Sequence, residues 1–138
     1  MGLYLCVFDA SGEELEGVEI GAYADFKVFR DAVTLNVEGG VRGSVCPVLQ
    51  GHSDCDGEWS PRESRDLLIE FDNIEKALSK LPSVEFNSDW KRQVSKVYAL
   101  SPKNLLECFF DVDGELLITR LRQLAVVSVN SEQPILFQ

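Results

Sequence analysis

Residues 60–82 read SPRESRDLLIEFDNIEKALSKLP, and this stretch predicts a helix with one buried face. Ser60 is a good helix cap, Pro61 suits the first helical position, and Glu63 completes a capping box with Ser60. Apolar side chains then recur at steps of four and three, which is helical spacing; they are Leu67, Phe71, Ile74, Leu78 and Leu81. Since a proline cannot continue a helix, Pro82 marks the end of the element.

Three further stretches have helical spacing, and four short ones have the composition of strands. The predicted helices lie at residues 23–38, 89–100 and 115–129, and the predicted strands lie at residues 3–8, 18–22, 44–49 and 135–137. Pro47 restricts the third strand to a sheet edge or an irregular conformation. Residues 108–112 fit either a strand or a continued helical turn. Together these elements predict an α+β fold, with a small mixed or antiparallel sheet and about four helices packed mainly on one face.

Length and composition predict a single globular domain over residues 1–138. Of the 138 residues, 45% are apolar and 26% charged, which is sufficient for one core without disulfides. No apolar run reaches the roughly 18 residues that span a bilayer. The N-terminus lacks the basic segment of a signal peptide, so we expect a cytoplasmic protein that does not bind membranes. The cysteines are widely spaced and expected to be reduced thiols; they are Cys6, Cys46, Cys55 and Cys108.

Acidic residues outnumber basic ones by 23 to 13, which gives a formal net charge of −10. Phosphate backbones would be repelled by this charge, so it argues against nucleic-acid binding. The acids are concentrated near the N-terminus, where no lysine or arginine precedes Lys27. One explanation is solubility, and the other is a surface complementary to a basic partner.

The densest group of reactive side chains is HSDCDGEW at residues 52–59. The histidine, cysteine and carboxylates are competent metal ligands. Contiguous ligands fit poorly around one ion, however, and the chain has no second histidine, so we expect neither a metal nor a cofactor. Catalysis by His52 stays open as the alternative function, that of a small cytosolic enzyme. Its partners would be a cysteine or the carboxylates of Asp54, Asp56 and Glu58.

The pattern D-x-D-G-E occurs at residues 54–58 and again at residues 111–115, and it resembles half of a calcium loop. A calcium loop needs a glutamate at its twelfth position. That position holds Arg65 in the first case and Arg122 in the second. We therefore expect tight turns in which the aspartate accepts backbone hydrogen bonds and the glycine takes a positive φ.

Several motifs resemble those of one protein family. They are MGLYLCVFD at residues 1–9, GVEIGAYADF at 17–26, FRD at 29–31, HSDCDGEW at 52–59, DVDGE at 111–115 and PILFQ at 134–138. Together they resemble a bacterial immunity protein family, the one numbered seventy, which is found with polymorphic toxin systems. The likeness runs from the first residue to the last.

The resemblance implies a protein that protects the producing cell by binding a cognate toxin domain and blocking it, without catalytic or cofactor-binding residues. Many toxins of such systems act on nucleic acids and are basic, so by analogy acidic patches would steer association and occlude the toxin. The resemblance names neither the toxin nor an oligomeric state. The partner-binding residues that we predict are Asp54, Asp56, Glu58 and Trp59, together with Asp9, Glu13, Glu14 and Glu16.

Overall fold

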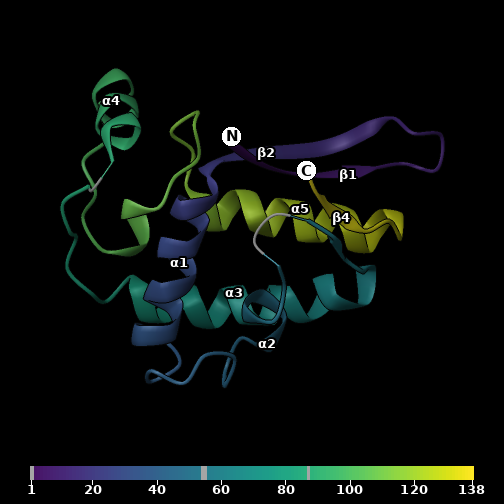
Figure 1. Cartoon of the computed structure of the whole chain (residues 1–138), viewed down its shortest axis with the longest axis horizontal. Coiled ribbons are helices and arrows are strands. Elements are labelled where there is room, and N and C mark those ends of the chain that lie inside the picture. The colour runs from purple at the N-terminus through teal and green to yellow at the C-terminus, as the bar shows by residue number, and fades with distance from the viewer. Residues whose placement is uncertain (1, 54–55, 87) are drawn as a thin grey trace.

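The computed structural model describes residues 2–53, 56–86 and 88–138. They form a four-stranded antiparallel sheet with helices packed against it, which confirms the predicted α+β fold (Figure 1). The strands are β1 (Gly2–Phe8), β2 (Glu14–Ala22), β3 (Glu58–Trp59) and β4 (Ile135–Phe137), in the order β2-β1-β4-β3. β2 and β3 are therefore the two edges of the sheet.

The helices are α1 (Tyr23–Asn36), α2 (Pro47–Gln50), α3 (Pro61–Leu78), α4 (Asp89–Val97) and α5 (Leu117–Ser131), with a short 3₁₀ helix, η1 (Leu106–Cys108). Figure 1 shows α3 and α5 lying lengthwise beside each other, α1 crossing them near one end, and α4 standing apart from this group. The predicted helices at residues 23–38, 89–100 and 115–129 correspond to α1, α4 and α5. After η1, Phe110 makes only an isolated bridge to Leu116.

Helix α3 begins with the predicted capping box. The amide of Glu63 donates to the Ser60 Oγ at 3.1 Å, and the amide of Ser60 donates to the Glu63 carboxylate at 3.0 Å. The first four side chains of the predicted stripe are completely buried in the core, and Leu81 is half-buried. Because capping and burial both follow the local sequence, this helix was predictable without knowledge of the rest of the fold.

Alternation along β1 separates the two faces of the sheet. Leu3, Leu5 and Val7 are fully buried and point into the core, on the side that we call the inner face. The intervening side chains of β1 point to the opposite side, the outer face. In an antiparallel sheet, residues directly opposite each other share a face, so the pairing of the strands assigns the side chains of β2, β3 and β4 as well.

The strand predicted at residues 44–49 is wrong, because this segment contains the short helix α2. Pro47 occupies its first turn. The amides of Val45 and Cys46 donate to the carboxylate of Glu38, and those of Val48 and Leu49 donate to the carboxylate of Glu70 in α3. Buried amides at the start of a helix need such acceptors, and two distant carboxylates supply them.

A buried arginine completes the support of this segment at its other end. Arg30 of α1 donates to the carbonyl oxygens of Gln50 and His52, at 2.8 and 2.7 Å. The Gln50 side chain donates in return to the Arg30 carbonyl and to the carboxylate of Glu38, at 2.8 and 3.0 Å. Acids at the start of α2 and a cation after its end also match the dipole of the helix.

Phe71→Ala should lower the free energy of unfolding by about 3–5 kcal/mol, because the ring is completely buried and its loss leaves a cavity. Ile69→Ala on the same helix is the matched control: its side chain is 63% exposed, so its loss should change stability by less than about 0.5 kcal/mol. Urea unfolding of both variants measures the difference. Equal, small effects would contradict the buried face of α3.

Glu70→Gln should destabilise the fold by about 1–3 kcal/mol. The glutamine NH2 group only donates, so it cannot accept a hydrogen bond from the amide of Val48 or Leu49, whereas both oxygens of a carboxyl group can accept. Burial raises the pKa of Glu70, so its contribution to stability is complete below the unfolded pKa and declines as pH rises through the native pKa. Glutamine does not titrate. The stability difference between wild type and variant should therefore shrink as the pH rises above about 4, the ordinary pKa of a glutamate.

Urea unfolding at a series of pH values above about 4 tests this prediction, with Glu13→Gln, an exposed change in the turn before β2, as the control. A difference between wild type and Glu70→Gln that grows with pH would contradict it.

Candidate partner-binding surface

His52 stabilises the loop that precedes β3. Its Nε2 lies 2.9 Å from the carbonyl oxygen of Glu58, and its Nδ1 lies 2.8 Å from that of Ser53. The ring stacks on Phe137 with a centroid distance of 4.2 Å. Gly57 has a φ of 88°, and a Cβ there would lie 3.1 Å from the His52 Nε2. The glycine thus allows both the turn and the close approach of the imidazole.

These contacts give His52 a structural role. Among the described residues, both ring nitrogens face backbone carbonyl oxygens and not a thiol or a carboxylate. Cys6, Cys46 and Cys108 are buried and free, as predicted. Within the described parts of the chain, no three potential ligand side chains lie close enough to hold a metal ion. Asp54 and Cys55 lie outside the described residues.

Trp59, which we predicted as a partner-binding residue, is buried in the structure and does not form an exposed anchor. Its side chain is 1% exposed and belongs to the core, where its Nε1 donates to the Val48 carbonyl at 3.2 Å. The ring packs edge-on against Phe137 of β4. Trp59 pairs with Ile135, so both lie on the inner face, whereas the preceding Glu58 lies on the outer one.

Two acidic turns share one geometry, at residues 9–13 and 111–115. In each, one oxygen of the first aspartate accepts the amides two and four residues later, at 2.9–3.0 Å. The fourth residue is a glycine with positive φ, as predicted for residues 111–115. Asp9 also accepts the hydroxyl of Ser11, and these hydrogen bonds hold the pKa of Asp9 below its ordinary value. The Asp9 carboxylate is therefore used to hold its own turn.

Glu16 is likewise occupied by a structural contact. Its carboxylate lies 3.3 Å from the guanidinium of Arg120 in α5 and also accepts the amide of Gly17. Arg120 in turn donates to the Gly17 carbonyl at 2.7 Å, so the arginine and the glutamate together cover the free edge of β2. These two side chains are only about one-quarter exposed, so the predicted partner-binding residue Glu16 already has a contact within the fold.

Two of the remaining predicted acids, Glu14 and Glu58, lie on the outer face of the sheet. Glu58 pairs with Leu136, Leu136 with Cys6, and Cys6 with Gly17, so one row of residues crosses all four strands. Glu58 and Gly17 are three strand spacings, about 14 Å, apart. The carboxylate of Glu14 lies over Gly17, because a Cβ on that glycine would be 2.9 Å from its Oε1.

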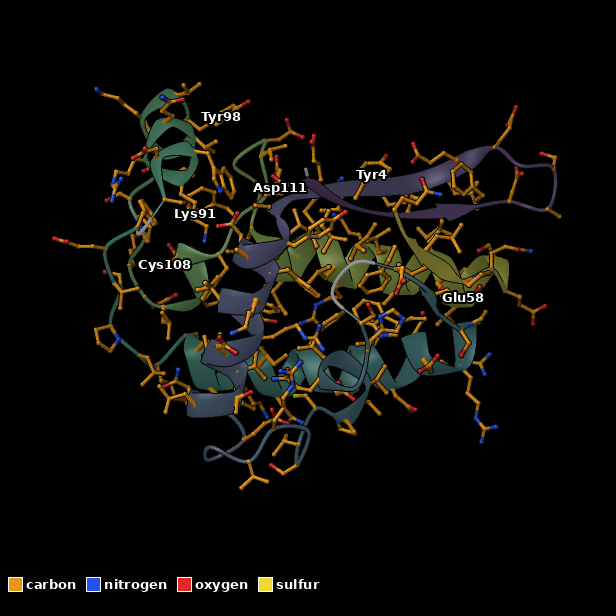
Figure 2. All side chains as sticks on the ribbon, viewed as in Figure 1. Tyr4, Glu58, Lys91, Tyr98, Cys108 and Asp111 are labelled. Atoms are coloured by element: carbon orange, nitrogen blue, oxygen red, sulfur yellow. The ribbon has the colours of Figure 1, made fainter. Side chains whose placement is uncertain are left out.

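Tyr4 joins Glu14 on this face. Its hydroxyl donates to the Glu14 carboxylate at 2.5 Å, and its ring passes over Gly17, where a Cβ would collide with it. The pairing partner of Tyr4 is Glu19, which is exposed on the same face. Figure 2 labels Tyr4 on β1 and Glu58, which belongs to the edge strand β3.

We define the acidic face as Glu14, Glu19 and Glu58, together with the half-buried Tyr4, Phe8 and Leu136. Glu58 and Glu14 were predicted from the sequence, and the fold brings them to one face. Glu13 and Asp56 are exposed in the adjoining turns, and in the described structure their side chains make no hydrogen bond or ion pair. Tyr4 and Glu19 were missed, although the alternation of residues 3–8 and their strand partners carried the signal.

Comparison of the sequence with known protein families identifies one match. The model of the family described as Immunity protein 70 matches residues 3–137, which is nearly the whole chain. No curated protein and no solved structure shows a significant match to the chain. Among the described residues, no helix is both long enough and apolar enough to cross a membrane.

Glu14→Gln should lower the pKa of Tyr4, which the hydrogen bond to the Glu14 carboxylate, with burial, raises to about 12. Without that carboxylate the phenol should titrate nearer its ordinary value of about 10. Ultraviolet titration of the tyrosinate band measures this, with Tyr4→Phe to identify the signal and Glu13→Gln as the control. An unchanged titration in Glu14→Gln would show that the contact does not persist in solution.

Proposed function

The chain belongs to the immunity protein 70 family, and from this membership we propose that it neutralises a cognate bacterial toxin by binding the toxin and occluding its functional surface. The observation that carries the proposal is the family match over residues 3–137. We place the protein in the cytoplasm of the producing cell, where it would protect against the toxin of its own system. In this proposal the protein is a binding protein and not an enzyme.

We propose the acidic face as the toxin-binding surface. Its three carboxylates lie on one side of the sheet, and the carboxylates of Glu19 and Glu58 make no ion pair in the described structure. The net charge of −10 extends the attraction toward a basic partner and raises the rate of association. The half-buried aromatic and aliphatic side chains between the carboxylates supply apolar area that charge alone would not.

The proposal is tested with the toxin domain encoded in the adjacent reading frame. Co-expression of the two proteins should remove the toxicity of that domain, and the purified proteins should form a stable complex in which the toxin is inactive. If the toxin domain neither binds this chain nor loses activity in its presence, the proposal is wrong.

Asp56→Lys and Glu58→Lys should slow association with that toxin domain and weaken its dependence on salt, because each change removes attraction to a basic surface. Thermal stability should stay nearly unchanged, since both side chains are exposed. Asp66→Lys, on the exposed side of α3, is the control with the same change in net charge. Stopped-flow measurement at two salt concentrations separates the variants. An equal effect of all three would assign the attraction to net charge and not to this face.

A further inference from the structure

A groove of about 500 Å³ opens between helix α4 and the end of the sheet. One side is formed by Val94 and Val97 of α4 and by Tyr98 directly after it, and the other includes Gly2 of β1 and Glu19 of β2. Because Glu19 also belongs to the acidic face, the groove continues that face toward α4. Figure 1 shows α4 standing beyond this end of the sheet, away from α3 and α5.

Two aromatic side chains, one in α4 and one directly after it, hold the helix in this position by packing on glycines. Trp90 lies on Gly21, where a Cβ would be only 2.7 Å from its ring, and its Nε1 donates to Asp25 at 2.8 Å. Tyr98 lies on Gly114, where a Cβ would be 2.8 Å from the ring. Both glycines have positive φ. Any larger residue at these positions would displace α4, so the wall of the groove depends on them.

A buried lysine also holds α4 in position. Lys91 is 6% exposed, donates to the carbonyl of Cys108 at 3.3 Å and lies 4.9 Å from the centre of the Phe109 ring. Figure 2 shows Lys91 directed from α4 toward the segment that carries Cys108. The contacts of the ammonium group with the Cys108 carbonyl and with the rings of Phe109 and Phe110 therefore tie α4 to this segment.

The fixed helix nevertheless leaves large apolar side chains uncovered. Val97 is 76% exposed and Tyr98 is 51% exposed, and both line the groove. Single exposed apolar residues are ordinary, but a group of them around a concave site is typical of a binding surface. The groove is therefore suited to an apolar side chain of a partner.

The charge of the groove decides between possible partners. Glu19 is exposed, and in the described structure its carboxylate makes no hydrogen bond or ion pair. A second copy of this chain would bring a further net charge of −10 to the site, which opposes self-association. A partner with a lysine or arginine beside its apolar side chain would complement both Glu19 and Val97.

We infer that this groove is the anchor site for the toxin: it receives an apolar side chain of the toxin while a neighbouring basic side chain of the toxin pairs with Glu19. The inference rests on the proposed function and adds a second part to the proposed surface. The acidic face would steer the encounter, and the groove would slow dissociation, because well-packed apolar anchors act mainly on the dissociation rate.

The experiment measures binding of the full chain to the toxin domain encoded in the adjacent reading frame. Val97→Glu should weaken affinity at least tenfold, mainly through faster dissociation, because the new carboxylate cannot be desolvated in the groove. Leu35→Glu on α1 is the matched control, since Leu35 is 72% exposed and lies away from the groove; its affinity should equal that of wild type. Glu19→Gln should reduce both the affinity and its dependence on salt.

Each outcome has a distinct meaning. If wild type binds and Val97→Glu binds equally well, the groove is not the anchor, while the proposed function stands. If wild type does not bind the toxin domain, the proposed function and this inference are both wrong. If sedimentation shows that wild type is a dimer and that Val97→Glu is a monomer, the groove is an interface between two copies, and the inference is wrong.

Discussion

The structure depends on satisfying the buried backbone of residues 45–52. Buried amides and carbonyls must find hydrogen-bond partners, and here the partners are the side chains of Glu38, Glu70 and Arg30. This network fixes α2 between α1 and α3, and it places His52 against Phe137. Through His52 it also sets the loop that leads into β3. The outward direction of Glu58, at the far edge of the sheet, therefore follows from charged groups buried beneath the inner face.

Local signals in the sequence were sufficient for α3, β1 and the turn at residues 111–115, because capping, alternation and a positive-φ glycine act within a few residues. They were insufficient for α2 and β3. Residues 44–49 are apolar enough for a strand, and the acceptor that makes them helical, Glu70, lies more than twenty positions away. The position of Trp59 was not predictable for a similar reason: it was predicted as a partner-binding residue, whereas its pairing with Ile135 directs its side chain into the core.

The acids show why composition could locate an acidic region without identifying a site. Asp9 holds a turn, Glu16 covers a strand edge, and Glu14 and Glu58 project from the outer face. The residues are chemically alike, and only strand pairing and the position of Arg120 separate these tasks. A strand register that differed by one residue would move Glu14 and Glu19 to the inner face. The acidic face is thus a property of the register rather than of the net charge.

The same contacts limit how a partner can bind. An exposed sheet edge can accept a strand from another protein, but three backbone groups along the middle of β2 are already occupied. The Gly17 carbonyl accepts from Arg120, the Gly17 amide donates to Glu16, and the Glu19 carbonyl accepts from the amide of Val112. The other edge, β3, has two residues, too few to template an added strand.

Strand addition is therefore disfavoured at both edges, and the proposed recognition depends on side chains on the outer face and in the groove beside α4. Since side chains can vary without disturbing the backbone pairing, such a surface can change its partner while the fold stays the same.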